Sequence, residues 1–487
     1  MRWLIAALAA LTLAAPLSAQ TIIARVEGVS DSATVRVLPA PAGDVGGDSV
    51  PPVVASLFAT PREQSPHFDF ARYTFTDFCY CWDGAKGDTA RALAARRYDL
   101  IMSGNLEAWS ALNSTADLLP YALVQTVFTE EPDTTKAHKV DANSLSGKYQ
   151  YDARSWYAQH PQFSYESLYL HDLSPTPTDS ASRLHFVIWN NYRYALNPLD
   201  PGALAYTIDR LRRLRASRPV GTGLFFDEMD RHAWSWYGRS REGAGVDSTT
   251  WHAAVVAFVK AVHDSLGVMT QSNAAEYSPG QFDRAIGVAA GAMHLERMGK
   301  ATGEMTKTWA FIDSLTHLGV YVDLVSLETF DDFARYGRNF YPPGNYTDAI
   351  GRGKTFQLAS YYMVVDSLAR LVGLQTDNTR GYPPDSVWLP IYQLDVGHPR
   401  GKRYVWADTT DALGQVARTY RRDFDNAVVL ARPITSYKYP KMTDTTAVPV
   451  PLPEGGPWSY VTARGDIVPI DSLELRNSEA VILVRRP

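Results

Sequence analysis

Short apolar runs of the β type alternate along the chain with longer stretches whose apolar residues recur at every third or fourth position. The runs predict strands at 70–75, 98–103, 121–128, 223–227, 268–272, 292–296, 322–328 and 387–394. The stretches between them predict amphipathic helices at 88–97, 201–217, 249–267, 303–319 and 354–371, with Gly267 and Gly319 where helix C-caps fall. Strand, helix and strand in regular succession indicate parallel strands joined by helical crossovers.

The predicted fold class is therefore α/β: a (β/α)8 TIM barrel over residues 67–421 with a small C-terminal β-domain over 422–487. Short β-type runs separated by the Pro-rich stretch AVPVPLPEGGP indicate the second domain. Residues 20–66 mix β-prone pieces with Pro/Gly-rich spacing, which is typical of a leader segment. The interval 129–200 is rich in Tyr, Trp, His and Asp and contains a further predicted strand at 183–190, so we expect it to decorate the active-site face.

The first residues have the layout of a cleavable secretory signal. Arg2 precedes an apolar run from Trp3 to about Ala15, and small residues follow near Ala19, which predicts a signal peptide over residues 1–19. The run is shorter than the roughly 20 apolar residues that span a bilayer, and no later stretch qualifies. We expect a mature protein without a membrane span that is secreted or periplasmic.

Composition and charge narrow the function classes. The chain is 45% hydrophobic and 12% aromatic, enough to fill a large core, and its net charge of -5 comes with dispersed basic residues. It therefore lacks the basic surface that nucleic-acid binding requires. Cys79 and Cys81 are the only cysteines, too few for a structural zinc site, and two residues apart on a strand they have awkward bridging geometry. No phosphate-binding, dinucleotide-binding or HExxH motif is present, so we expect no cofactor and no metal.

Acidic residues follow several predicted strands, and the densest group is Asp227, Glu228 and Asp230 after the apolar run GLFF. In a barrel of parallel strands, catalytic side chains come from the carboxyl ends of the strands. Neighbours on a strand point to opposite faces, so Asp227 and Glu228 do not both face the pocket. Gly223 and Phe225 share the side of Asp227, and a small residue beneath the acid suits a crowded barrel axis, which favours Asp227.

Glycosidic hydrolysis uses two carboxyl groups on either side of the scissile bond, so a partner acid from another strand is required. Glu296 ends the run AMHLE and is the expected general acid. His294 lies two residues before it, on the same predicted side of the strand. Glu328 and Asp395 follow later strands and are weaker alternatives. Each acid also has a structural reading, as a helix cap or as the partner of a nearby base such as Arg231 or Arg297.

Aromatic side chains gather on the predicted loops, where flat rings stack on the apolar faces of sugars. Trp156, Tyr157, Tyr192 and Tyr194 belong to the interval before the acidic cluster, and ordinary packing under long loops is the alternative reading of each. The residues expected to contact substrate are Glu228, Asp230, Trp189, Asn190, Trp234, Trp236, Tyr237, Asn273, His294 and Glu328.

The stretch YALNPLDPGALAYTIDRLRRLRASRPVGTGLFFDEMD resembles a pattern of the hypothetical glycosyl hydrolase family fifteen, and more distantly the endo-polygalactosaminidase-like barrels. RRYDLIMS and RRDFDNAVVLARP fit the same resemblance, which spans roughly residues 70–487. It implies a barrel in which Asp227 is the acid at the end of strand four and Glu296 takes the place of the acid/base partner. Thr222-Gly223 stands where the family has Asp-Gly.

These observations predict an exported glycoside hydrolase that cleaves O-glycosidic bonds of an oligo- or polysaccharide. Asp227 is the expected nucleophile or base and Glu296 the expected acid. A non-catalytic carbohydrate-binding barrel is the first alternative, since the aromatic loops alone would serve it. A metal-dependent hydrolase or deacetylase is the second, because His171, His294 and His398 are available as ligands.

Overall fold

The computed structural model is described by the following parts of the chain: 21–23, 34–37, 73–77, 98–103, 106–124, 126–128, 149–171, 182–188, 191–218, 220–227, 229, 247–273, 283–295, 305–325, 348–365, 371–378, 389–410, 416–433, 447–476 and 478–486. The signal peptide predicted at 1–19, Cys79 and Cys81 lie outside these residues. No helix within the described parts is long and apolar enough to cross a membrane.

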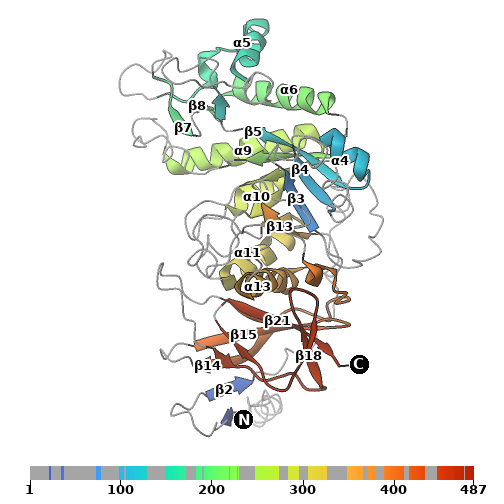
Figure 1. The fold of residues 1–487 in the computed structure, drawn as a ribbon. Helices are drawn as coiled ribbons and strands as arrows, with labels where there is room; N and C mark the ends of the chain where they lie inside the picture. Colours follow the sequence, from blue (N-terminus) through green and yellow to red (C-terminus); the bar gives the residue numbers. More distant parts are fainter. Residues whose placement is uncertain are drawn as a thin grey trace, which may run out of the picture.

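Eight parallel strands close into a barrel, as predicted (Figure 1). In chain order they are β3 (Tyr73–Asp77), β4 (Leu100–Ser103), β5 (Asp117–Leu123), β9 (Gly223–Asp227), β10 (Met269–Ser272), β11 (Gly291–Leu295), β12 (Tyr321–Val325) and β13 (Val372–Asn378). Each strand pairs with the next, and β13 closes the barrel on β3. All carboxyl ends therefore lie at one rim.

One barrel strand was predicted in the wrong place. The eighth strand is β13, whereas the stretch 387–394 contains a short 3-10 helix, η4 (Pro390–Gln393). Ile391 and Tyr392 within this stretch are buried all the same and belong to the core. The predicted helix 354–371 also runs too far: helix α13 (Asp348–Val364) ends before Val365. Asp395 consequently follows no barrel strand.

Helices cover the outside of the barrel. These are α4 (Leu106–Leu112), α6 (Pro201–Ser217), α9 (Ser248–Leu266), α10 (Arg284–Ala290), α11 (Met305–Thr316) and α13. The predicted bounds of α6 and α9 agree with the structure to within one residue, because both have strong end signals. Asp200 caps α6 by accepting a hydrogen bond from the backbone N of Ala203, and Gly267 ends α9 in the left-handed conformation at φ 61°. The predicted helix 88–97 lies outside the described residues.

An antiparallel sheet forms the C-terminal domain. It contains β14 (Tyr404–Thr410), β15 (Val416–Asp423), β16 (Val428–Arg432), β18 (Trp458–Val461), β19 (Ile467–Ile470) and β21 (Glu479–Arg485), beside the small pair β17 (Val448–Pro449) and β20 (Glu474–Leu475). Two strands from the predicted leader, β1 (Thr21–Ile23) and β2 (Thr34–Val37), extend its edge beside β14. The sheet thus joins segments from both ends of the chain.

Helix α13 connects the two parts of the molecule, lying between the barrel and β21 in Figure 1. Phe356 and Leu358 of this helix share one hydrophobic cluster with Val429 and Ile482 of the sheet. Arg422 on β15 donates from Nη1 to the carbonyl oxygens of residues 362 and 365 at the end of the helix, both at 2.8 Å. Shared apolar packing and a buried arginine therefore hold the sheet against the barrel.

A smaller three-stranded sheet is inserted in the chain between β5 and β9, which are themselves neighbours in the closed barrel. Its strands are β6 (Thr126–Phe128), β7 (His185–Ile188) and β8 (Asn191–Ala195), and helix α5 (Tyr149–Gln159) and the 3-10 turn η2 (Glu166–Leu168) accompany it. The run predicted as one strand at 121–128 is thus divided between β5 and β6. Because β6 begins just after the carboxyl end of β5, this insertion lies at the rim where catalytic residues gather in such barrels.

Candidate active site

Strand alternation selects the side chains that enter the barrel. Leu119, Phe225, Met269, Ala292 and Tyr321 form a separate buried cluster inside it. Residues two positions further along the same strands face the same side, nearer the carboxyl rim. Those positions are Tyr121 on β5, Asp227 on β9, Gln271 on β10, His294 on β11 and Asp323 on β12, and the interior becomes polar at this level.

Asp227 faces the barrel interior, as alternation predicted, and both of its carboxylate oxygens are held. The hydroxyl of Tyr121 donates to Oδ2 at 2.8 Å, and Nδ2 of Asn273 donates to Oδ1 at 2.8 Å. Asp227 is only partly buried. An acid that accepts on both oxygens and remains reachable from the rim is already oriented for attack or proton transfer.

Asn273 is placed by the backbone around it. Its N–H donates to the carbonyl oxygen of Phe226 at 2.7 Å, and its own carbonyl oxygen accepts from the N–H of Met229 at 3.1 Å. These two bonds tie the residue after β10 to the end of β9 and to the turn that follows. Asn273 was predicted to contact substrate; in the structure its side chain donates a hydrogen bond to Asp227.

Gly223, two strand positions before Phe225, stands where there is no room for a side chain. A Cβ atom at Gly223 would lie 2.6 Å from the carbonyl oxygen of Met269 and 2.7 Å from Cδ2 of Leu119. Such contacts are shorter than van der Waals packing allows. The expectation that the axis below the acid is crowded is therefore confirmed.

A second buried carboxylate, Asp323, was missed by the sequence analysis. It is fully buried on β12, where Thr74 donates from Oγ1 to Oδ1 at 2.6 Å and Nδ1 of His294 lies 3.0 Å from Oδ2. A carboxylate only accepts, so Nδ1 of His294 carries a proton, and Nε2 is the ring nitrogen that Asp323 leaves available. An acid in the middle of the apolar run YVDLV was the signal for this residue, since a buried charge requires partners.

Two contacts hold the imidazole ring of His294 in one orientation. Its ring packs edge-on against Phe225, with centroids 5.2 Å apart, while Asp323 holds Nδ1. Register aligns His294 with Asp323 across β11 and β12, and Asn273 follows directly after β10. Four consecutive strands, β9 to β12, thus supply an arc of polar side chains around the rim.

Other predicted site residues cannot be placed in this arc. Glu228, Asp230, Trp189, Asn190, Trp234, Trp236, Tyr237, Glu296 and Glu328 lie outside the described residues. Along the chain, Glu296 directly follows Leu295, the last residue of β11, and Trp189 and Asn190 stand between β7 and β8. Their roles remain sequence predictions.

Asp395 belongs to the turn after η4 and not to the carboxyl end of a barrel strand. It is exposed, and its carboxylate accepts from the backbone N of Gly397 at 2.9 Å and from Nδ2 of Asn426 at 3.3 Å. Among the described residues, no three His, Cys, Asp or Glu side chains converge as metal ligands.

Two of the aromatic residues expected on loops are packed instead. Trp156 is 9% exposed and Tyr157 3% exposed, and both belong to the main core. The Trp156 ring stacks on His160, with centroids 3.9 Å apart, and on Phe163 at 5.9 Å. Burial raises the pKa of Tyr157 above its ordinary value, and the charge of Asp200 adds to this shift. These rings support the insertion and offer no free face to a sugar.

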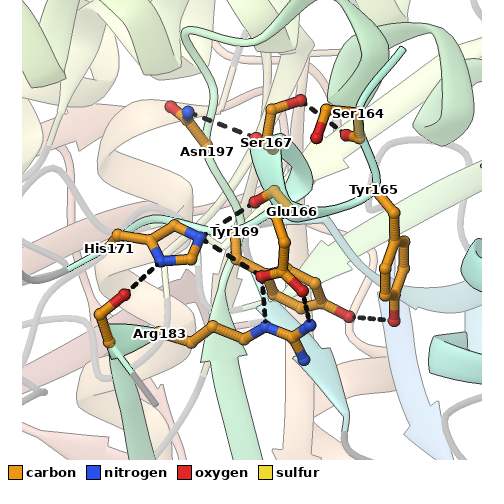
Figure 2. Close-up of polar contacts among 9 residues, drawn as sticks. Ser164, Tyr165, Glu166, Ser167, Tyr169, His171, Arg183 and Asn197 are labelled. Atoms are coloured by element: carbon orange, nitrogen blue, oxygen red, sulfur yellow. Dashed lines mark hydrogen bonds and ion pairs between the residues drawn. The ribbon is translucent and has the colours of Figure 1, made fainter. Parts of the chain in front are cut away.

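A buried arginine holds the insertion together, as Figure 2 shows. Arg183 pairs with Glu166 on η2 through Nε and Nη2, and its guanidinium lies 3.9 Å from the centroid of the Tyr169 ring. Burial acts to lower the pKa of Arg183, but the hydrogen bond to Glu166 prevails and raises it above the usual value. This clamp joins η2 to the chain segment that leads into β7.

His171, which Figure 2 labels, belongs to the same cluster, and Ser182 lies beside it. Nε2 of His171 lies 3.0 Å from the carbonyl oxygen of Glu166, so it carries the ring proton, and Nδ1 accepts from Oγ of Ser182 at 2.7 Å. Such a pair has the chemistry of a base beside a hydroxyl nucleophile. Ser182 is only 3% exposed, however, so the pair serves to fasten the two chain segments.

Comparisons with known sequences leave the family open. No family model matches the chain, and no curated protein matches it.

Comparisons with solved structures find distant likenesses to glycoside hydrolases with barrel folds. A noncanonic maltogenic alpha-amylase from Thermotoga neapolitana has a TM-score of 0.40 at 9% identity, over 85% of this chain and 98% of the other. The type III pullulan hydrolase from Thermococcus kodakarensis has a TM-score of 0.40 at 10% identity, over 88% and 76%. Ega3 from Aspergillus fumigatus, solved with galactosamine, has a TM-score of 0.33 at 11% identity, over 66% and 95%. Likeness at this level concerns the fold alone.

Proposed function

We propose that this chain is an exported glycoside hydrolase that cleaves O-glycosidic bonds of an oligo- or polysaccharide with two carboxyl groups. The observation that supports it is Asp227, a partly exposed carboxylate at the carboxyl rim of a closed barrel, with both oxygens held by Tyr121 and Asn273. The signal-like first nineteen residues support export to the periplasm or the medium. The stretch around GTGLFFDEMD supports membership of the hypothetical glycosyl hydrolase family fifteen.

In the proposed reaction, Asp227 acts on one side of the sugar ring and Glu296 on the other. Glu296 donates its proton to the glycosidic oxygen as the bond to the anomeric carbon breaks. Asp227 either attacks the anomeric carbon itself or takes a proton from the water that does so. Tyr121 and Asn273 hold its carboxylate in place, which removes the need to reorient it at the transition state.

His294 is proposed to position the substrate and not to transfer the proton. Asp323 holds Nδ1, so Nε2 is the ring nitrogen left to bond a sugar hydroxyl, and the 4% exposure of His294 limits this contact to substrate that enters the barrel. Because Asp323 is fully buried and bonded on both oxygens, it acts through His294 and does not touch the sugar.

Substitution of the two acids tests this proposal. Asp227→Asn and Glu296→Gln should each lower turnover about 10²- to 10⁴-fold, the usual contribution of a positioned acid or base. Asp209→Asn is the matched control, because Asp209 is an exposed acid on α6 paired with Arg213. A reducing-sugar assay across a polysaccharide panel measures turnover, and thermal unfolding checks the fold. Unchanged turnover in Asp227→Asn would contradict the assignment, and glycan binding without any product would indicate a non-catalytic module.

A further inference from the structure

A cleft of about 610 Å³ opens between helix α13 of the barrel and the C-terminal sheet, and no residue of the arc around Asp227 lines it. The first turns of α13, with Arg352 and Thr355, form one wall, and the chain from Tyr460 to Asp466 forms the other. Residues of β20 and the beginning of β21 form the floor. Pockets that bind small ligands have volumes of roughly 300 to 1,000 Å³, so the cleft has a suitable size.

Strand pairing creates this cleft. β18 pairs with β21 from Trp458 opposite Arg485 to Tyr460 opposite Leu483, and then turns away at Thr462, whose N–H donates to the carbonyl oxygen of Asp466 at 2.8 Å. The first residues of β21 still pair with β16 on their other side. The cleft occupies the place that a longer β18 would fill, so it is a feature of the backbone.

The lining combines an apolar floor with a polar rim. Leu475 and Ala480 are buried in the floor, and the partly exposed ring of Tyr460 stands beside them. At the rim, Nε of Arg352 lies 3.1 Å from Oε1 of Glu479, with side chains 38% and 15% exposed. Glu474 is exposed and makes no ion pair within the described residues. Flat apolar surface beside planar charged groups of both signs suits a neutral polyhydroxylated ligand.

The topology places this cleft at the same end of the barrel as Asp227. Helix α13 lies between β12 and β13, which are parallel neighbours, so it runs antiparallel to them. Its first turns, which carry Arg352 and Thr355, therefore lie towards the carboxyl rim.

We propose that the cleft is a second, non-catalytic binding site for a glycan chain. A sugar ring stacks on Tyr460, and its hydroxyl groups bond the Arg352–Glu479 pair and Glu474. The inference rests on the proposed function, since it takes the ligand class from it. The site increases the local concentration of a polymeric substrate at the barrel mouth and leaves hydrolysis of short substrates unaffected.

Affinity electrophoresis of the whole chain tests the site in native gels that contain soluble starch, galactomannan or xylan. Asp227→Asn serves as the parent, so that the polymer is not digested. At least one gel should retard the parent, and adding Tyr460→Ala or Arg352→Ala should weaken association about tenfold, or about 1.4 kcal/mol. Tyr460→Phe keeps the ring and should bind like the parent. Arg213→Ala removes an exposed ion pair elsewhere and is the control for charge.

The outcomes separate this inference from the proposed function. If no gel retards the parent, or if Tyr460→Ala and Arg352→Ala migrate like it, the cleft is not a glycan site. If the unmutated chain hydrolyses no glycosidic bond while retardation still depends on Tyr460, the proposed function fails and the second site stands. Unfolding temperatures of all variants should agree with that of the parent, which excludes loss of the fold as the cause.

Discussion

Gly373 on β13 has no room for a side chain, and substituting it should destabilise the barrel. A Cβ atom there would lie 2.1 Å from the hydroxyl oxygen of Tyr321 and 2.8 Å from Cγ2 of Thr74. Both neighbours are fully buried, so neither ring nor methyl group can swing into solvent. Gly373 does not have a left-handed backbone, so the cost of Gly373→Ala is steric.

The expected magnitude follows from these contacts. Overpacking a close-packed core by one methyl group costs about 1 to 3 kcal/mol, and the 2.1 Å contact places Gly373→Ala near the upper end. Tyr321→Phe removes the oxygen and leaves Cζ at 3.2 Å from the new methyl group, which is tight but tolerable. In the double variant, about 1 to 2 kcal/mol of the cost should therefore be recovered as a coupling energy.

A double-mutant cycle in urea measures this coupling. Unfolding is followed by tryptophan fluorescence for the parent, each single variant and the pair, and midpoints are compared at a common m value. Thr74→Ser in the Gly373→Ala background is a further check, because it keeps the hydroxyl that binds Asp323 and removes the crowded methyl group. Strictly additive single effects would show that the Tyr321 hydroxyl does not occupy the space beside Gly373.

Three further predictions concern a buried acid and two helix caps. Asp323→Asn keeps the shape of the side chain but removes the charge that holds Nδ1 of His294. We expect kcat/KM to fall at least about tenfold and the ¹⁵N chemical shifts of the His294 ring to change. Unchanged shifts would show that Asp323 does not set the tautomer of His294. Asp200→Ala removes the cap of α6 and should cost about 1 kcal/mol in urea unfolding, whereas Asp200→Asn should keep most of it, and equal losses would argue against the cap. Hydrogen bonds from the hydroxyl and then from the backbone N–H of residue 250 lower the pKa of Asp247, which caps α9. The stability that the charged Asp247 contributes to the fold is therefore complete above the unfolded pKa of about 3.9 and is lost as pH falls through the folded pKa. Asp247→Asn should therefore show a shallower fall of Tm below about pH 4, and an identical acid profile would remove that contribution.

Local pattern was a good guide where a segment carries both its period and its end signals. Helix α6 agrees at both ends with the predicted range, because Asp200 and Pro201 mark its start. The eighth strand was misplaced because α13 and β13 follow each other in one apolar stretch, from Phe356 to Leu374, without a strong breaker before Gly373. The run VWLPIYQL has strand composition, yet its described part forms the 3-10 turn Pro390–Gln393.

The candidate site shows the same division. Strand parity together with Gly223 on the same side favoured Asp227 over Glu228, and the structure places Asp227 on the inner side with its partners. The partners themselves were not evident, because Tyr121 is 106 positions away from Asp227 in the chain. Asp323 was not predicted, because the prediction considered acids at the ends of strands. In the structure it is fully buried, and it positions His294.

Period and residue type were sufficient for the class of fold, the orientation of Asp227 and the crowding around Gly223, because these depend on alternation along one strand. Three-dimensional packing decided which segment closed the barrel, which aromatic rings were covered and which acid was bonded to His294. Such features depend on contacts between residues far apart in the chain, and closing the barrel brings those residues together.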